Sequence, residues 1–426
     1  MPILLSILVL ITIPGQLLRI SLFDRIGVLP SDLIVLLVFV FGLISIFLYK
    51  KKYYKNLRKL FWPSSIFFLW AFISLIFSIN NLSLSWGEII QSGAYYFRYL
   101  AYFMIIFIAP YCINKKNYYY WKYLLFGSAF LISILGFLQL KFFPSFYDLR
   151  MHEKGWDPHI GRLLSTWFDP NLLGGYLVFV LNIMGGEIFN SYRRKKYNQF
   201  FYLSLLAFVI FLALVLTYSR SAYLALLISG FVFAFYIDKR LIIVGLLSIF
   251  ITLSLSTRVQ TRVMDAWGSA QSLFFQTEKT ADPTSKLRID SWRIGWKLFS
   301  NNKITGVGFN TLKIIQKREW SMMTKSHAGS GIDASLLTVA STTGIIGLIS
   351  FLFFWLIVIK NSFINFKKTH DVFFMGLISG IIGIFIHGIF VNILFFNLFL
   401  PTLFLAVALS QISFEKSNAP KFILKK

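Results

Sequence analysis

Cysteine and acidic residues are scarce in this chain of 426 residues. The single cysteine, Cys112, excludes an intramolecular disulfide and a metal cage made of cysteines. Only 17 Asp and Glu residues stand against 42 Lys and Arg, which gives a net charge of +25. The chain also has no phosphate-binding P-loop, no His-Glu-x-x-His and no Asp-x-Asp. We therefore expect a functional site that uses no cofactor and no metal.

Apolar residues are abundant instead. The chain is 57% hydrophobic and 19% aromatic, which is far outside the composition of soluble domains. This composition predicts an all-α, polytopic bundle of transmembrane helices with the lipid bilayer as its surroundings. Most Lys and Arg residues lie in short clusters between apolar runs, as orientation signals do. We therefore expect no nucleic-acid partner, in spite of the charge.

Apolar runs of about 17 to 22 residues predict about twelve spans, within a range of ten to twelve. Residues 1–256 carry the first nine spans, 257–334 form one large extracytoplasmic loop, 335–411 carry the last three, and 412–426 form a basic tail. The expected spans are near 3–19, 32–49, 61–79, 94–111, 121–141, 171–190, 200–217, 222–237, 240–256, 335–359, 373–391 and 394–411.

The basic clusters fall on alternate connections between these spans. By the positive-inside rule, the clusters lie in the cytoplasm together with both termini. The segment Met1–Pro14 has no basic region before it and no cleavage signature, so we expect it to remain as part of the first span. The connections expected outside are 20–31, 80–93, 142–170, 217–221 and 257–334.

The large loop holds twelve Lys or Arg residues and six acids. Within it, residues 285–300 have the pattern of an amphipathic helix, with Leu287, Trp292, Trp296 and Phe299 on the face that we expect at the membrane surface. Asn301 and Asn302 should end this helix, and the glycines at 306 and 308 should form a turn.

Three arginines are candidates for binding an anion. Arg220 lies in the short turn between two spans, where a guanidinium is costly unless it faces a polar cavity; a snorkelling role at the interface is the alternative. Arg162 precedes a span, and Arg288 begins the amphipathic helix one turn before Trp292. Contact with lipid headgroups is the simpler interpretation of Arg288.

Two residues of the loop are candidates for a general base. His327 can take a proton from a hydroxyl near neutral pH, although a lone loop histidine is more often only solvated. Asp333 stands at the start of the tenth span, where it is either a base or a helix cap. Asp169 and Pro170 have the pattern of a helix start. Polar groups inside the spans are few, and the main ones are Arg98, Glu187 and His387.

Four segments, taken in order, resemble the O-antigen ligase and polymerase family. They are Leu216-Thr217-Tyr218-Ser219-Arg220-Ser221-Ala222, the stretch from Arg162 to Asn171, the helix from Arg288 to Trp292 followed by Ile304-Thr305-Gly306-Val307-Gly308-Phe309, and Ala340-Ser341-Thr342-Thr343-Gly344-Ile345-Ile346-Gly347. The resemblance extends over about residues 155 to 350, and the first five spans are compatible with it.

The resemblance implies an enzyme on the outer face of the bacterial inner membrane that moves a glycan from undecaprenyl diphosphate to a sugar hydroxyl. It implies that Arg220 and Arg288 bind the diphosphate, with Arg162 as a further candidate. In the ligases, a histidine stands about eleven residues before the glycine at position 344, where this chain has Asp333. Either Asp333 replaces that histidine as the base, or His327 reaches the site.

The sequence therefore favours a metal-independent glycosyltransferase that polymerises lipid-linked repeat units of a surface polysaccharide. Ligation of the polymer to lipid A-core or to another saccharide or glycolipid acceptor is the close alternative. A polysaccharide or lipid flippase is a third reading, although the chain lacks the paired halves and midplane charges of such transporters. A chain-length regulator is a possible partner.

Overall fold

The computed structural model describes residues 1–22, 26–49, 55–147, 150–154, 156–275, 283–319 and 331–412. Helices dominate this part of the chain, and one short antiparallel hairpin joins β1 (Ile20–Leu22) to β2 (Ile26–Val28). The helices in chain order are α1 (Pro2–Leu10), α2 (Pro30–Tyr49), α3 (Lys55–Asn81), α4 (Trp86–Phe103), α5 (Ile105–Ile108), α6 (Tyr118–Phe142), α7 (Pro170–Arg193), α8 (Tyr197–Leu216), α9 (Arg220–Ile237), α10 (Arg240–Leu255), α11 (Thr257–Phe275), α12 (Pro283–Asn301), α13 (Leu312–Glu319), α14 (Ser335–Thr369), α15 (Phe373–His387) and α16 (Leu400–Gln411).

The prediction of an all-α membrane protein is confirmed. Among the described residues, eight helices are long and apolar enough to cross a membrane, and a ninth span results if α10 and the start of α11, bent by 107°, count together. Every expected span coincides with a helix, but α1, α15 and α16 have only 9, 15 and 12 residues. The expected number of twelve spans is therefore not confirmed.

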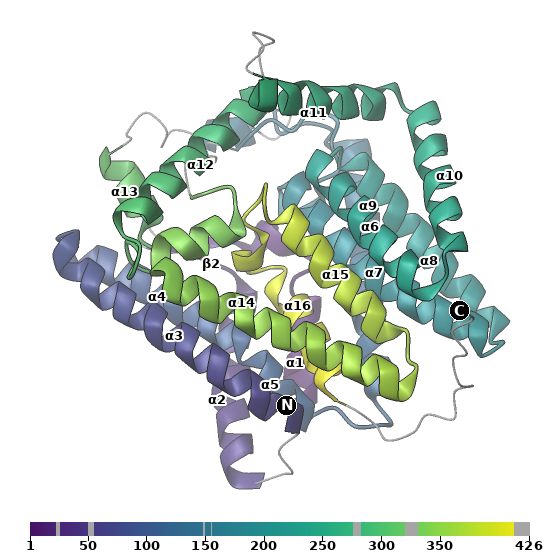
Figure 1. Cartoon of the computed structure of the whole chain (residues 1–426), viewed down its shortest axis with the longest axis horizontal. Helices are drawn as coiled ribbons and strands as arrows, with labels where there is room; N and C mark the ends of the chain where they lie inside the picture. The colour runs from purple at the N-terminus through teal and green to yellow at the C-terminus, as the bar shows by residue number, and fades with distance from the viewer. Residues whose placement is uncertain are drawn as a thin grey trace.

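Helix α7 lies at the centre of the bundle and packs against α15, α8 and α9 (Figure 1). Glycines allow the close approach of α7 and α15: a side chain at Gly186 would meet the backbone of Val372, and one at Gly376 would meet the backbone of Asn182. Small residues at such crossings are typical of membrane helices, which gain their packing energy from close contact. The rigid α7–α15 pair supports the candidate site described below.

Helix α14 is broken at Gly344, whose φ of 66° belongs to the left-handed region that favours glycine. The break exposes carbonyl groups that the helix would otherwise pair. The turn after α12 satisfies them, because the Val307 amide donates to the Ser341 carbonyl at 2.9 Å and the Gly308 amide donates to the Thr342 carbonyl at 3.1 Å. Two of the segments that resemble the family therefore hold each other in place.

The large loop carries α11, α12 and α13. Figure 1 shows α10, α11 and α12 following one another around the edge of the bundle, with α12 reaching α14. The expected amphipathic helix is present and ends at Asn301. Leu287 and Trp296 of its apolar face are exposed, whereas Ser291 and Leu298 are buried. Gly295 lets Leu337 of α14 pack directly against the helix, because a side chain at this position would meet Leu337.

The connections between helices meet at two opposite ends of the bundle. At one end, Arg258 of the large loop donates to the Gly161 carbonyl at 2.7 Å. At the other end, the ammonium of Lys122 lies 2.9 Å from Glu187 and 3.5 Å from Asp371, with the Lys122 side chain fully buried. The candidate residues of the sequence analysis lie at the first end.

Candidate functional site

The segment before α7 and the turn before α9 are hydrogen-bonded to each other through Arg162. Its Nε donates to the Thr217 carbonyl at 2.9 Å, and its Nη2 donates to the Asn171 side-chain oxygen at 3.1 Å. The Ser219 hydroxyl donates to the same Asn171 oxygen at 3.0 Å. Two further segments of the family resemblance are therefore joined, with an arginine at the junction.

This junction brings two helix N-termini together. Asp169 caps α7 by accepting from the amides of Asn171 and Leu172 at 2.7 and 3.0 Å, and Pro170 takes the first helical position, as the sequence indicated. Helix α9 begins at Arg220, directly after Ser219. The amides and the dipole of a helix N-terminus favour anions. The Asp169 carboxylate is already the anion at the start of α7, so the start of α9, beside Arg162, is the end that favours a further anion.

Helix α12 fixes the backbone of Asp333 from the other side. The Ser291 hydroxyl accepts a hydrogen bond from the Asp333 amide at 3.0 Å, and Trp292 Nε1 donates to the Asp333 carbonyl at 3.1 Å. Arg288 lies one turn earlier on the same helix. The N-cap of α14 is Ala334, so the interpretation of Asp333 as that helix's cap is wrong. Its carboxylate is therefore left for another role.

The surroundings of Asp333 tune its acidity. Burial raises the pKa of this carboxyl from 3.8 to about 6. Arg288 opposes the rise by attraction, whereas the negative charges of Asp169 and Asp157 add to it. A carboxylate with a pKa just below neutral is ionised in neutral buffer and is a stronger base than an ordinary aspartate.

Arg162 belongs to the same group of charges. Burial lowers its pKa to about 10, Asp169 opposes this, and the nearby Arg262, Arg288 and Arg258 lower it further. The guanidinium remains protonated at neutral pH. The arginines at positions 258, 262 and 288 therefore lie within electrostatic range of Arg162, and we refer to these four residues as the arginine cluster. Arg288 thus lies within electrostatic range of both Arg162 and Asp333.

Two members of the arginine cluster were not recognised in the sequence. Arg258 donates to the carbonyls of Gly161 and Ile160 at 2.7 and 2.6 Å, and its guanidinium stacks on the Tyr218 ring at 4.2 Å. Arg262 follows one helical turn later on α11. Their spacing of four residues, directly after an apolar run, was the signal that could have identified a basic helix face.

The remaining candidates are placed less completely. Arg220 is the first residue of α9 and is half-buried, beside the hydroxyls of Ser219 and Ser221, which lie 3.3 Å apart. His327 lies outside the described residues. A histidine that the sequence analysis did not consider, His159, also lies here: burial lowers its pKa, Asp169 and Asp157 raise it, and Arg162 lowers it.

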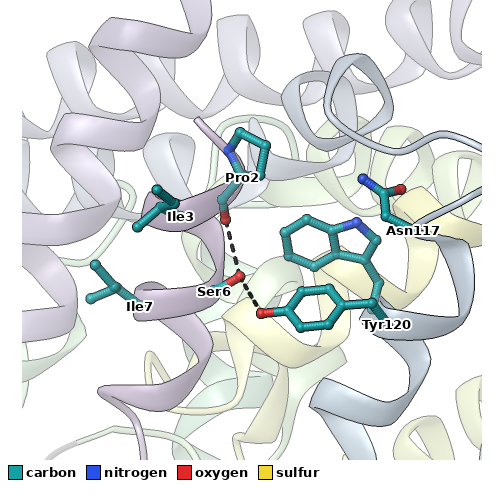
Figure 2. A pocket seen from close by; sticks show the side chains of 7 residues that line it. Pro2, Ile3, Ser6, Ile7, Asn117 and Tyr120 are labelled. Atoms are coloured by element: carbon teal, nitrogen blue, oxygen red, sulfur yellow. Dashed lines mark hydrogen bonds between the residues drawn. The ribbon is translucent and has the colours of Figure 1, made fainter.

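A cavity of about 380 Å³ lies elsewhere, between α1 and the start of α6 (Figure 2). Its lining is mostly apolar, and Tyr120 closes one side by donating to the Ser6 hydroxyl at 2.9 Å. Gln139, at the other end of α6, accepts from the Leu164 amide beside the candidate site. The length of α6 therefore separates this cavity from the arginine cluster, and we do not assign it to the site.

Residues 205–352 match the family model described as O-Antigen ligase. The matched region contains Arg220, Arg288, Asp333 and the break at Gly344, while Arg162 lies before it. No curated protein matches the chain significantly. The resemblance drawn from the sequence is thus confirmed by the match over residues 205–352 of this multi-pass membrane protein.

Proposed function

We propose that this protein is a metal-independent glycosyltransferase of surface-polysaccharide biosynthesis that takes its glycan from undecaprenyl diphosphate. The proposed acceptor is a sugar hydroxyl of the next lipid-linked repeat unit, which makes the enzyme a polymerase. We place it in the bacterial inner membrane with both termini in the cytoplasm and the arginine cluster on the outer face. A long outer loop and short basic inner loops are consistent with this orientation.

The donor diphosphate is proposed to bind where Arg162 and Arg288 meet the N-termini of α7 and α9, with Arg220 as a further ligand. The leaving group of the reaction is a diphosphate, and its developing charge needs neutralisation. Guanidinium groups form paired, charge-assisted hydrogen bonds with phosphate oxygens. Cations that are fixed before the reaction stabilise this charge without a metal ion.

Asp333 is proposed as the general base, with His327 as the alternative. The acceptor hydroxyl oxygen attacks the anomeric carbon of the donor glycan, and its proton passes to the Asp333 carboxylate. A new glycosidic bond forms as the bond between the anomeric carbon and the diphosphate oxygen breaks. The electron pair of the broken bond leaves with undecaprenyl diphosphate, next to Arg162 and Arg288.

The observation that carries this proposal is the shared neighbourhood of Arg162, Arg288 and Asp333. These residues come from three separate segments, and Arg288 acts electrostatically on both Arg162 and Asp333. A binding site for a substrate that is both anionic and hydroxyl-bearing needs both kinds of group within reach of one another. The family match alone, without this neighbourhood of arginines and a carboxylate, would support the class of enzyme but no particular site.

The test is a transfer assay with purified protein in lipid nanodiscs and a glycan on undecaprenyl diphosphate. Wild-type protein should lengthen the lipid-linked glycan, and Arg162→Ala should abolish this. Addition of lipid A-core as a competing acceptor distinguishes polymerisation from ligation. Transfer to lipid A-core alone would identify the enzyme as a ligase and contradict the proposed polymerase. Movement of the lipid-linked glycan across the bilayer of proteoliposomes, without a new glycosidic bond, would contradict the proposal and favour a flippase.

A further inference from the structure

His387 is the last residue of α15, and its imidazole is fully buried at the base of the candidate site. Both ring nitrogens are buried, and neither makes a well-formed hydrogen bond with a described residue, although the backbones of Asn171 and Ser221 lie close enough to act on the ring. Ionisable side chains inside membrane helices are costly and usually functional. A buried polar group without a partner needs an explanation, such as a role in binding a ligand.

The ring lies among the groups of the proposed site. A side chain at Gly175 of α7 would come within 2.5 Å of the ring carbon Cδ2 and 2.8 Å of Nε2, so the imidazole occupies the space that this glycine leaves. The backbones of Asn171 and Ser221 lie beside it, and Arg288 and Asp169 act on it electrostatically.

The adjoining backbone links His387 to the proposed base. The amide of Ser335 donates to the carbonyl of Gly388 at 2.7 Å, which places the end of α15 against the start of α14. Asp333 stands two residues before Ser335, and His387 stands one residue before Gly388. His387 and Asp333 therefore stand on the two segments that this backbone hydrogen bond joins.

We propose that His387 binds the acceptor saccharide by exchanging hydrogen bonds with one of its hydroxyl groups. A neutral imidazole offers one donor and one acceptor, and a hydroxyl group complements both. A phosphate oxygen would satisfy only the donor, so the acceptor sugar fits better than the donor diphosphate. The ring is closed from solvent in the free protein, so the sugar must displace a covering side chain; Ile393 contacts the same space beside Gly175. This inference rests on the proposed transfer reaction.

The test compares His387→Leu with His387→Gln in nanodiscs. If the imidazole serves only the substrate, Leu removes two unsatisfied polar atoms and the variant melts at or above the wild-type temperature. The same variant should bind the lipid-diphosphate donor as tightly as wild type, while its KM for the acceptor rises at least about tenfold, the effect of one lost hydrogen bond at about 1.4 kcal/mol per factor of ten. Gln keeps a donor and an acceptor and should restore part of the affinity.

Three results would overturn the proposal: an unchanged KM in His387→Leu, a loss of donor binding equal to the loss of transfer, or a variant that fails to fold. Gly175→Ala provides an independent probe, because the added methyl group displaces the ring without changing its chemistry, and it should also raise the acceptor KM. Failure of the wild-type protein to transfer any glycan would instead refute the proposed function. The two failures are therefore distinguishable.

Discussion

Replacement of Asp333 by Asn should make the protein more stable and inactive at the same time. The rise of the Asp333 pKa from 3.8 to about 6 means that the ionised carboxyl is less favourable in the folded protein than in the unfolded chain. This preference corresponds to about 3 kcal/mol, since one pKa unit equals about 1.4 kcal/mol. The penalty is absent below pH 3.8, grows as the pH rises to about 6, and is fully present at neutral pH. Asn has nearly the same shape and carries no charge.

The free energy of unfolding of Asp333→Asn should therefore exceed that of wild type by up to about 3 kcal/mol at pH 7.5, and the two should converge toward pH 4. Thermal melting in nanodiscs across this pH range measures the difference. Transfer should fall by about 10²- to 10⁴-fold, the usual contribution of a general base. Wild-type kcat/KM should decline below about pH 6. A less stable Asn variant at pH 7.5, or one with normal transfer, would refute the role of Asp333.

Arg288→Ala should lower transfer by about 10²- to 10³-fold, because a fixed cation near the leaving diphosphate is lost. Arg293→Ala on the same helix is the matched control, since that side chain is 76% exposed and pairs with Asp290 at the surface, and it should change transfer by less than about twofold. Gly344→Ala should destabilise the protein by more than about 1–3 kcal/mol, because an alanine is strained at this φ and its methyl group would meet the Ile304 backbone. Gly230→Ala is the control, because a methyl group added at this helical position would meet no atom within 4 Å, and it should be neutral or stabilising. Equal melting temperatures of Gly344→Ala and Gly230→Ala would argue against the break in α14 at Gly344. Lys122→Met should cost about 3–5 kcal/mol in thermal unfolding, because two buried carboxylates lose their cation, and unchanged melting would contradict the buried pair. Finally, EDTA should leave transfer unchanged, whereas a loss that Mg²⁺ or Mn²⁺ restores would show metal dependence.

The apolar pattern of the chain was sufficient to predict most helices and several residues of the site. Continuous apolar runs determine where helices form in a membrane, so helices coincide with all the expected spans. Asp169 and Pro170 start α7 as their residue types indicated. Arg162, Arg288 and Asp333 became candidates through their places beside apolar runs and through the family resemblance.

The features that were missed depend on contacts between distant segments. Arg258 was not predicted, because its place in the site depends on contacts with Gly161 and Tyr218, which are distant in the sequence. The contact of α12 with α14 was not predicted, because it depends on Gly295 and on Leu337, which is distant in the sequence. Lys122 escaped notice inside an apolar run, since its partners are contributed by α7 and by the turn before α15.

The central claim is that the donor diphosphate sits between Arg162 and Arg288, next to the Asp333 carboxylate. A cryo-electron microscopy structure of the Asp333→Asn variant in nanodiscs, with an undecaprenyl-diphosphate glycan bound, measures this directly. We predict that density for the diphosphate contacts both guanidinium groups, with the anomeric carbon of the glycan facing residue 333. Diphosphate density at the opposite end of the bundle, near Lys122, or away from both arginines would contradict the account.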